Sequence, residues 1–245
     1  MPRYANAPII EAIIDIRVRM PKDVSFYHLK SAQAGVAAAF PIVENLHESI
    51  VAFGQGPGPF DEEMQRRTRS SPLFKSKDGH RIWQSRLDGF TFSQLNPYNT
   101  WKDFLNATAS AWASYRKATK PEAIVRLALK YVNRFDIPEP VNDLKSFLRT
   151  VPEVSPDLPQ PKVGGLFMQL QIPQPDIEGM LVLTEAMVPP PQVGVVSVVL
   201  DIEVSRQNNL PQTDTEIWSY FEKLRERKNQ VFEASITDAA RELIS

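Results

Sequence analysis

The residues with the clearest chemical potential lie in one segment, RLALKYVNRFDIP, at positions 126–138. Arg126, Tyr131, Asn133 and Arg134 interrupt an otherwise apolar run whose length and composition predict a strand. Buried polar side chains must be hydrogen-bonded, so these four either form a structural network or line a cavity. In a cavity, the arginines would supply forked donors for a carboxylate or phosphate, and Tyr131 and Asn133 would orient it. The segment therefore predicts either a closed polar core or a pocket for a small anionic ligand.

A second candidate is a basic stretch with interleaved aromatic residues between positions 65 and 86, in which Asp78 is the only acidic residue. Its members are Arg66, Arg67, Arg69, Lys75, Lys77, Arg81, Trp83 and Arg86. Basic and aromatic side chains on a sheet can contact phosphates and stack on bases. The stretch thus indicates either a nucleic-acid surface or a solvated hairpin face, compensated by the acidic residues at 61–63.

Recognisable catalytic and metal-binding motifs are absent from the sequence. There is no phosphate-binding P-loop and no Gly-x-Ser-x-Gly turn, and the three histidines, His28, His47 and His80, are not at ligand spacing. We therefore predict no catalytic residue, no metal and no cofactor. The alternative is a hydrolase or transferase that uses dispersed carboxylates, and its candidates are Glu11, Asp15 and Asp136.

The composition is that of a globular protein without strong electrostatic bias. The chain has 245 residues, 42% of them hydrophobic, a formal net charge of -1 and no cysteine. Lack of cysteine excludes disulfides and thiolate chemistry and fits a reducing compartment, so we expect a cytoplasmic protein. The apolar stretch near the N-terminus is broken by Glu11 and Asp15 and is too short to span a bilayer, so we expect no membrane partner.

The elements that must position these residues are mostly strands. Alternating or β-branched apolar runs predict strands near 9–19, 42–53, 72–77, 80–87, 90–95, 123–137, 163–172, 179–188 and 194–205. Asp78-Gly79 and Asp88-Gly89 are hairpin turn signals, which predict an antiparallel meander. Helical spacing predicts helices over 25–40, 101–120 and 213–232, and Thr213 with Glu216 forms a capping box for the last of these.

The order of these elements predicts an α+β fold in which helices pack on antiparallel sheets. Residues 1–120 and 121–245 both read as strand, helix, strands, helix, so we expect two similar halves packed as one compact unit. In such a repeat, Glu11 and Arg126 would mark corresponding surfaces, which adds Glu11 to the ligand-binding candidates. This order of elements is similar to that of the helix-grip and TATA-binding-protein-like folds.

The sequence also resembles a sporadically distributed, uncharacterised family of prokaryotic proteins. The resemblance begins with an Asn-x-Pro-hydrophobic-hydrophobic-Glu motif, here residues 6–11, and continues through Pro97-Tyr98, Trp101 and Phe104. It extends to the strand motif Tyr131-x-Asn133-Arg134 and to the tail at Asn229, Phe232, Ile236 and Thr237. The family carries no established activity or catalytic residue. What the resemblance implies is an accessory role in mobile or defence-linked gene clusters.

The prediction that follows is a non-enzymatic binding or interaction protein, since no catalytic constellation is found. Its partner would be another protein or a second copy. A second copy could dock on the apolar stripe of the last helix, which carries residues such as Trp218 and Phe221. Two alternatives stay open. One is nucleic-acid binding through residues 65–86, and the other is the enzyme with dispersed carboxylates.

Overall fold

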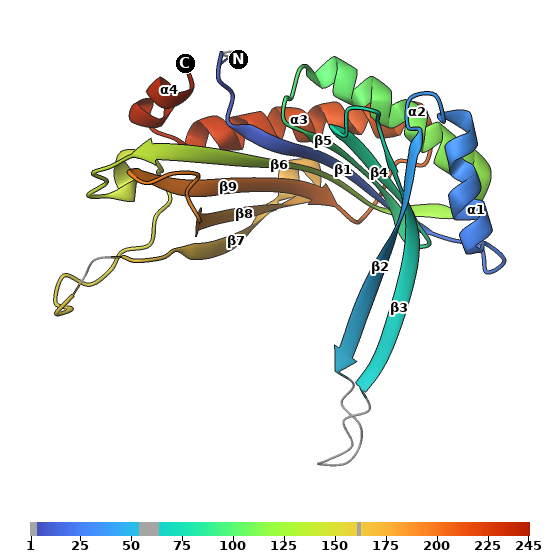
Figure 1. Ribbon diagram of the computed structural model, residues 1–245, viewed down its shortest axis with the longest axis horizontal. Helices are drawn as coiled ribbons and strands as arrows, with labels where there is room; N and C mark the ends of the chain where they lie inside the picture. The colour runs from blue at the N-terminus through green and yellow to red at the C-terminus, as the bar shows by residue number, and fades with distance from the viewer. Residues whose placement is uncertain (1–3, 54–63, 161–162) are drawn as a thin grey trace. The chain divides into compact units, whose positions relative to one another are not determined.

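The computed structural model describes residues 4–53, 64–160 and 163–245, with the backbone alone for 47–53 and 64–69. Its strands are β1 (Ile9–Arg19), β2 (Ile42–Phe53), β3 (Met64–Lys75), β4 (Arg81–Arg86), β5 (Gly89–Leu95), β6 (Ala123–Pro138), β7 (Phe167–Gln174), β8 (Gly179–Val188) and β9 (Val195–Arg206). Its α-helices are α1 (Phe26–Ser31), α2 (Trp101–Thr119), α3 (Asp214–Ser235) and α4 (Asp238–Ile244) (Figure 1). Short 3₁₀ turns are η1 (Ala32–Gly35), η2 (Leu144–Ser146) and η3 (Pro175–Ile177).

The strands form one nine-stranded antiparallel sheet in the order β2-β3-β4-β5-β1-β6-β9-β8-β7, with the four helices packed on it. The predicted α+β class and antiparallel pairing are therefore confirmed. The strand predicted at 72–77 is longer than expected, because β3 begins at Met64 and pairs with β2 along its whole length. Its polar residues 65–71 lack the apolar alternation on which a sequence-based strand assignment depends.

Contacts along the chain divide it into two compact units. Unit 1 comprises the described residues of Met1–Ile16, Ser93–Thr100 and Ile124–Ser245, and unit 2 those of Arg17–Phe92 and Trp101–Ala123. The N-terminal part of β1 thus belongs with β6 to β9: in unit 1, the N–H of Arg134 donates to the carbonyl of Pro8 at 2.8 Å.

Unit 2 has an aromatic core beneath α2. The ring of Phe90 lies 5.7 Å from the rings of both Trp112 and Tyr115 on the helix, and the hydroxyl of Tyr115 donates to the carbonyl of Arg86 at 2.8 Å. The aromatic residues whose helical spacing predicts α2 therefore form the buried face of that helix.

The helix predicted over 25–40 is shorter than expected. It runs as α1 and then tightens into η1, where a Cβ on Gly35 would lie only 2.4 Å from the Ser114 hydroxyl oxygen. That hydroxyl donates to the carbonyl of Ala32 at 2.5 Å. The close approach to α2 therefore favours glycine at this position, which is the last residue of η1.

In unit 1, α3 lies along one face of the strands and packs on β9 (Figure 1). It begins as predicted, because the Thr213 side chain accepts from the N–H of Glu216 and the Glu216 side chain returns to Thr213. On its apolar stripe, Phe221, Leu224 and Phe232 are buried, whereas Trp218 is half-buried. The residues of β9 that alternate toward α3 are also buried: Val198, Leu200, Ile202 and Val204. No helix in the described part of the chain is long and apolar enough to cross a membrane.

Candidate functional site

The alternation of β6 separates the candidate residues onto two faces of the sheet. Tyr131 and Asn133 are each 2% exposed and share a face with the buried residues that α3 covers. Arg126 and Arg134 point to the other face, which we call the open face of unit 1. The four side chains therefore do not line one pocket.

On the open face, Arg126 is held between two carboxylates. Its guanidinium donates to Asp15 Oδ1 at 3.2 Å and to Glu203 Oε1. The three side chains are only 21%, 14% and 25% exposed, so the triad is half-buried. The donors that could bind an external anion are thus occupied by the protein's own carboxylates.

Neighbouring charges on this face are paired in the same way. Lys130 lies 2.7 Å from Asp201, and Arg134 donates to Asp136 at 2.8 Å. Burial raises the pKa of Asp201. Lys130 acts to lower this pKa, whereas the negative charges of Glu203 and Glu11 raise it further. The face therefore carries ion pairs between strands, and one pair within β6, rather than an empty cationic site.

The dispersed carboxylates of the enzyme alternative are held separately. Asp15 lies in the Arg126 triad, whereas Asp136 accepts from Ser197 at 2.5 Å and from Arg134. Burial acts to raise the pKa of Asp136, but these two hydrogen bonds outweigh it and the pKa is lowered. Among the described residues, no group of three or more histidines or carboxylates is arranged to hold a metal ion.

On the covered face, the polar groups satisfy one another. The hydroxyls of Tyr131 and Tyr98 are 2.7 Å apart, and the Asn133 amide donates to the carbonyl of Leu200 at 3.0 Å. Burial raises the pKa of Tyr131 well above its usual value, so the phenol stays neutral. Of the two predictions for this strand, a closed polar core or a pocket for an anion, the positions of Tyr131 and Asn133 agree with the closed polar core.

Two buried ionisable groups in unit 1 were not found by sequence reasoning. Lys228 of α3 is 8% exposed, and its ammonium lies 4.0 Å from the centroid of the Tyr131 ring. Glu185 of β8 is 0% exposed, and neither carboxylate oxygen has a hydrogen-bond partner among the described residues. Each occupies a position where the periodicity of its element predicts an apolar residue: Lys228 is four residues after Leu224 on a helix, and Glu185 is two residues after Leu183 on a strand. A charged residue at such a position is the sequence signal that could have identified them.

Burial changes the protonation of both groups. Desolvation, with a contribution from Arg225, lowers the pKa of Lys228 to about 7. Desolvation alone raises the pKa of Glu185 to about 7. Such groups can mark functional sites. Here both are almost fully buried, since 8% of the surface of Lys228 and 0% of that of Glu185 is exposed.

The aromatic member of the basic stretch is part of the core of unit 2. Trp83 is 0% exposed, and its ring lies 4.2 Å from the ring of Phe74 and 5.6 Å from that of Phe90. A ring enclosed on both sides by aromatic neighbours has no face on which a base could stack.

The described basic side chains of the stretch are mostly paired. Lys75 lies 2.7 Å from Glu44, and Arg86 bonds to Asp88 at 3.2 Å and to Thr91 at 2.6 Å. Lys77 is exposed and Arg81 half-buried. The remaining members, with side chains outside the described part of the chain, are Arg66, Arg67 and Arg69.

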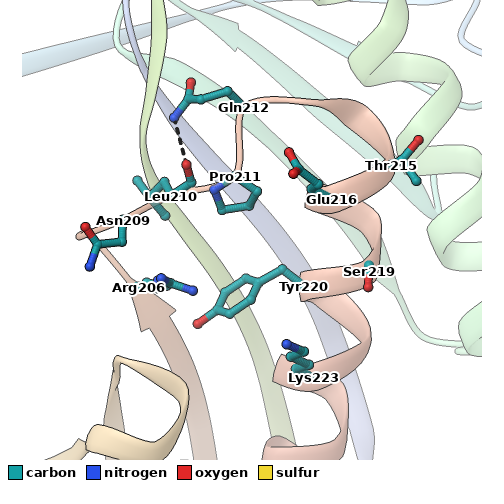
Figure 2. A pocket seen from close by; sticks show the side chains of 10 residues that line it. All are labelled: Arg206, Asn209, Leu210, Pro211, Gln212, Thr215, Glu216, Ser219, Tyr220 and Lys223. Carbon is teal, nitrogen blue, oxygen red and sulfur yellow. Dashed lines mark hydrogen bonds between the residues drawn. The ribbon is translucent and has the colours of Figure 1, made fainter.

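A polar depression of about 630 Å³ lies where β9 leads into α3 (Figure 2). It is lined by Arg206, Asn209, Leu210, Pro211, Gln212, Thr215, Glu216, Ser219, Tyr220 and Lys223. Arg206 is stacked 5.1 Å from the centroid of the Tyr220 ring and bonds to Glu178, while Glu216 belongs to the capping box. Its main charged groups are thus already engaged, and most of its lining is exposed.

The end of the sheet in unit 1 is the edge strand β7, which pairs with β8 from Phe167↔Ala186 to Gln174↔Gly179. Just before this ladder, the N–H of Met187 donates to the carbonyl of Leu166. Hydrogen-bonded pairs alternate along an antiparallel ladder, so even-numbered residues of β7 face β8 and odd-numbered residues direct their backbone groups outward.

The outward backbone groups of β7 belong to Phe167, Gln169, Gln171 and Pro173. Within the described residues, none of them bonds to another backbone. The strand FMQLQIPQ carries no charge, and the Phe167 side chain is 75% exposed. Soluble proteins commonly protect free edges with charges, so an uncharged edge of eight residues is a surface suited to pairing.

These features define an α+β protein with one helix-covered antiparallel sheet, an ion-paired open face in unit 1 and an uncharged free edge. No protein-family model matches the chain, and no curated protein matches it either.

Proposed function

We propose that the protein is a non-enzymatic interaction protein that binds a second polypeptide by strand addition along β7. The observation that carries the proposal is the outward row of backbone donors and acceptors at Phe167, Gln169 and Gln171 on a strand without charge. Main-chain hydrogen bonds to an added strand supply affinity, and alternate side chains supply specificity.

The state of the other candidate groups supports an interaction role over an enzymatic one. Arg126 and Arg134 are engaged with carboxylates, and the depression near Arg206 holds its cation against Tyr220 and Glu178. Nucleic-acid binding through residues 65–86 has less support, since Trp83 is buried and Lys75 and Arg86 are paired.

Following the family resemblance, we propose that this interaction role is one of the accessory functions of mobile or defence-linked gene clusters. The lack of cysteine leads us to propose that the protein acts in the cytoplasm. The tandem arrangement of two similar halves stays a prediction, and strand addition at β7 does not depend on it.

The test uses a library of random extended peptides selected against the full chain at submicromolar concentration. Each selected peptide is then measured on Gln171→Pro and on Gln171→Thr. Because the N–H of Gln171 points outward, as the nitrogen of Pro173 does, proline here removes an edge donor without breaking the ladder to β8.

We expect selected peptides to lose binding at least tenfold on Gln171→Pro and to keep it on Gln171→Thr. Hydrogen exchange should show protection of the amides of Phe167, Gln169 and Gln171 on peptide binding. Peptides that bind both variants equally, or a library that yields no binder, would contradict strand addition at this edge.

A further inference from the structure

Resting on the proposed function, we infer that the strand added to β7 is the β7 of a second copy of this chain, in an antiparallel pairing centred on Leu170. Residues 167–173 are Phe-Met-Gln-Leu-Gln-Ile-Pro. The order of apolar and polar residues in this segment is the same when it is read forwards or backwards. A centre at Leu170 places Leu170 opposite Leu170, Met168 opposite Ile172 and Gln169 opposite Gln171.

The backbone polarity of the edge agrees with this register. Outward-facing residues are odd-numbered, so a symmetric pairing must join odd residues to odd residues. The Leu170 centre does so, since Gln169 and Gln171 form hydrogen-bonded pairs with their counterparts. Pro173, which has no N–H, falls opposite Phe167 at each end of the ladder, where a single bond is sufficient.

The two faces of the pairing are also matched. A two-fold axis perpendicular to the sheet keeps the α3 side of one copy beside the α3 side of the other. Met168, Leu170 and Ile172 lie on that side, because they share register rows with Glu185, Leu183 and Leu181. The glutamines meet on the opposite side, where Gln169 already bonds to Thr184 at 3.1 Å.

Charge favours this occupant over an unrelated strand. In the chain as a whole 23% of the residues are charged, whereas β7 has no charged residue. Pairing β7 with itself places no like charges opposite each other and leaves no charge unpaired. The register also places the 75%-exposed Phe167 of each copy against the ring of Pro173.

The size of the contact determines its strength. About seven residues per copy is well below the ~20–30 residues per side of a standard interface. We therefore expect a reversible dimer that forms at micromolar concentrations rather than an obligate one.

Because the chain has no cysteine, engineered thiols report the register directly. In the Leu170-centred pairing, Leu170 faces its counterpart in a non-hydrogen-bonded pair, in which Cα atoms are about 4.5 Å apart and a disulfide can form. We expect Leu170→Cys to give a covalent dimer of twice 27.7 kDa in a glutathione redox buffer. The matched control, Gln169→Cys, is diagonal to its counterpart beyond disulfide reach and should cross-link at least tenfold less.

Three further measurements make the result decisive. Val193→Cys, at a 99%-exposed position, measures random collision. A mixture of Met168→Cys and Ile172→Cys should give the mixed dimer, which tests the same register if Leu170→Cys does not fold. Adding Gln171→Pro should abolish cross-linking, whereas Gln171→Thr should not.

Cross-linking at Leu170 no faster than at Val193, with a monomer mass by light scattering at 500 µM, would overturn the second copy as occupant. Cross-linking at Gln169 in place of Leu170 would overturn the register on which the inference is built. If the chain stays monomeric while selected peptides bind in a Gln171-dependent way, only the occupant is wrong. If the peptides fail as well, strand addition itself is wrong.

Discussion

The ammonium of Lys228 lies 4.0 Å from the centroid of the Tyr131 ring, so a helix cation is placed on the face of a buried strand aromatic. The Tyr131 hydroxyl is in turn 2.7 Å from that of Tyr98. Cation–π attraction compensates part of the desolvation of the ammonium, but the pKa of Lys228 is still lowered from 10.5 to about 7.

Lys228→Met should stabilise the protein at neutral and lower pH. Below pH 7 both states carry the charged lysine, and the folded state bears the full unfavourable burial of the ammonium. Between pH 7 and 10.5 the unfolded state binds more protons, so the free energy of unfolding rises with pH. We expect the variant to gain about 1–3 kcal/mol at pH 6 and to lack this rise, measured by urea unfolding from pH 6 to 10.

The control is Lys223→Met, which removes an exposed lysine from the same helix and should leave the pH profile unchanged. A Lys228→Met variant that is less stable than the parent at pH 6 would mean that the contact with Tyr131 outweighs desolvation.

Glu185→Gln should have the opposite pH dependence. The pKa of Glu185 is raised from 4.5 to about 7, so between these values the folded state binds more protons and the stability of the parent falls as pH rises. We expect the variant to match the parent at pH 4.5 and to exceed it by about 2–3 kcal/mol at pH 8. Urea unfolding at the two pH values measures the difference.

Glu226→Gln, at an exposed position of α3, is the matched control and should change neither value. Equal stability of parent and Glu185→Gln at pH 8 would show that the Glu185 carboxylate finds a partner or water in solution.

Arg126→Met should destabilise the protein, because it leaves the carboxylates of Asp15 and Glu203 half-buried without their shared cation. We expect a loss of about 1–3 kcal/mol at pH 7. Adding Glu203→Gln should recover part of the loss. Arg19→Met, which breaks an exposed pair with Glu122, should cost no more than about 0.5 kcal/mol, and an equal loss in both variants would contradict the triad.

Trp83→Ala should be strongly destabilising, by about 3–5 kcal/mol, because it opens a cavity between Phe74 and Phe90. Thermal unfolding measures the loss, and Tyr27→Ala, which removes a 76%-exposed ring from the same unit, should lie within about 0.5 kcal/mol of the parent. Retained stability in Trp83→Ala together with loss of nucleic-acid binding would instead favour the basic stretch as a working surface.

The local features of the fold could be predicted from the sequence. Apolar alternation located the strands, Asp78-Gly79 marked a turn in which Gly79 has a φ of 75°, and Thr213 with Glu216 marked the start of α3. These succeed because a turn, a cap or a strand face is determined by residues a few positions apart. Two predictions were wrong: the length of the helix around Gly35 and the start of the strand that includes residues 65–71. At Gly35 the structure depends on a contact with Ser114, and at 65–71 on pairing with β2, and neither partner is close in sequence.

The sequence alone determined that Arg126, Tyr131, Asn133 and Arg134 share a strand, and that this strand carries both charge and apolar surface. Only the tertiary structure decided which face α3 covers, which carboxylates meet Arg126, and that β7 ends the sheet. The physical reason is that burial and ion pairing depend on strand order. Strand order in turn is set by hydrogen bonds between segments far apart in the chain, which no local pattern records.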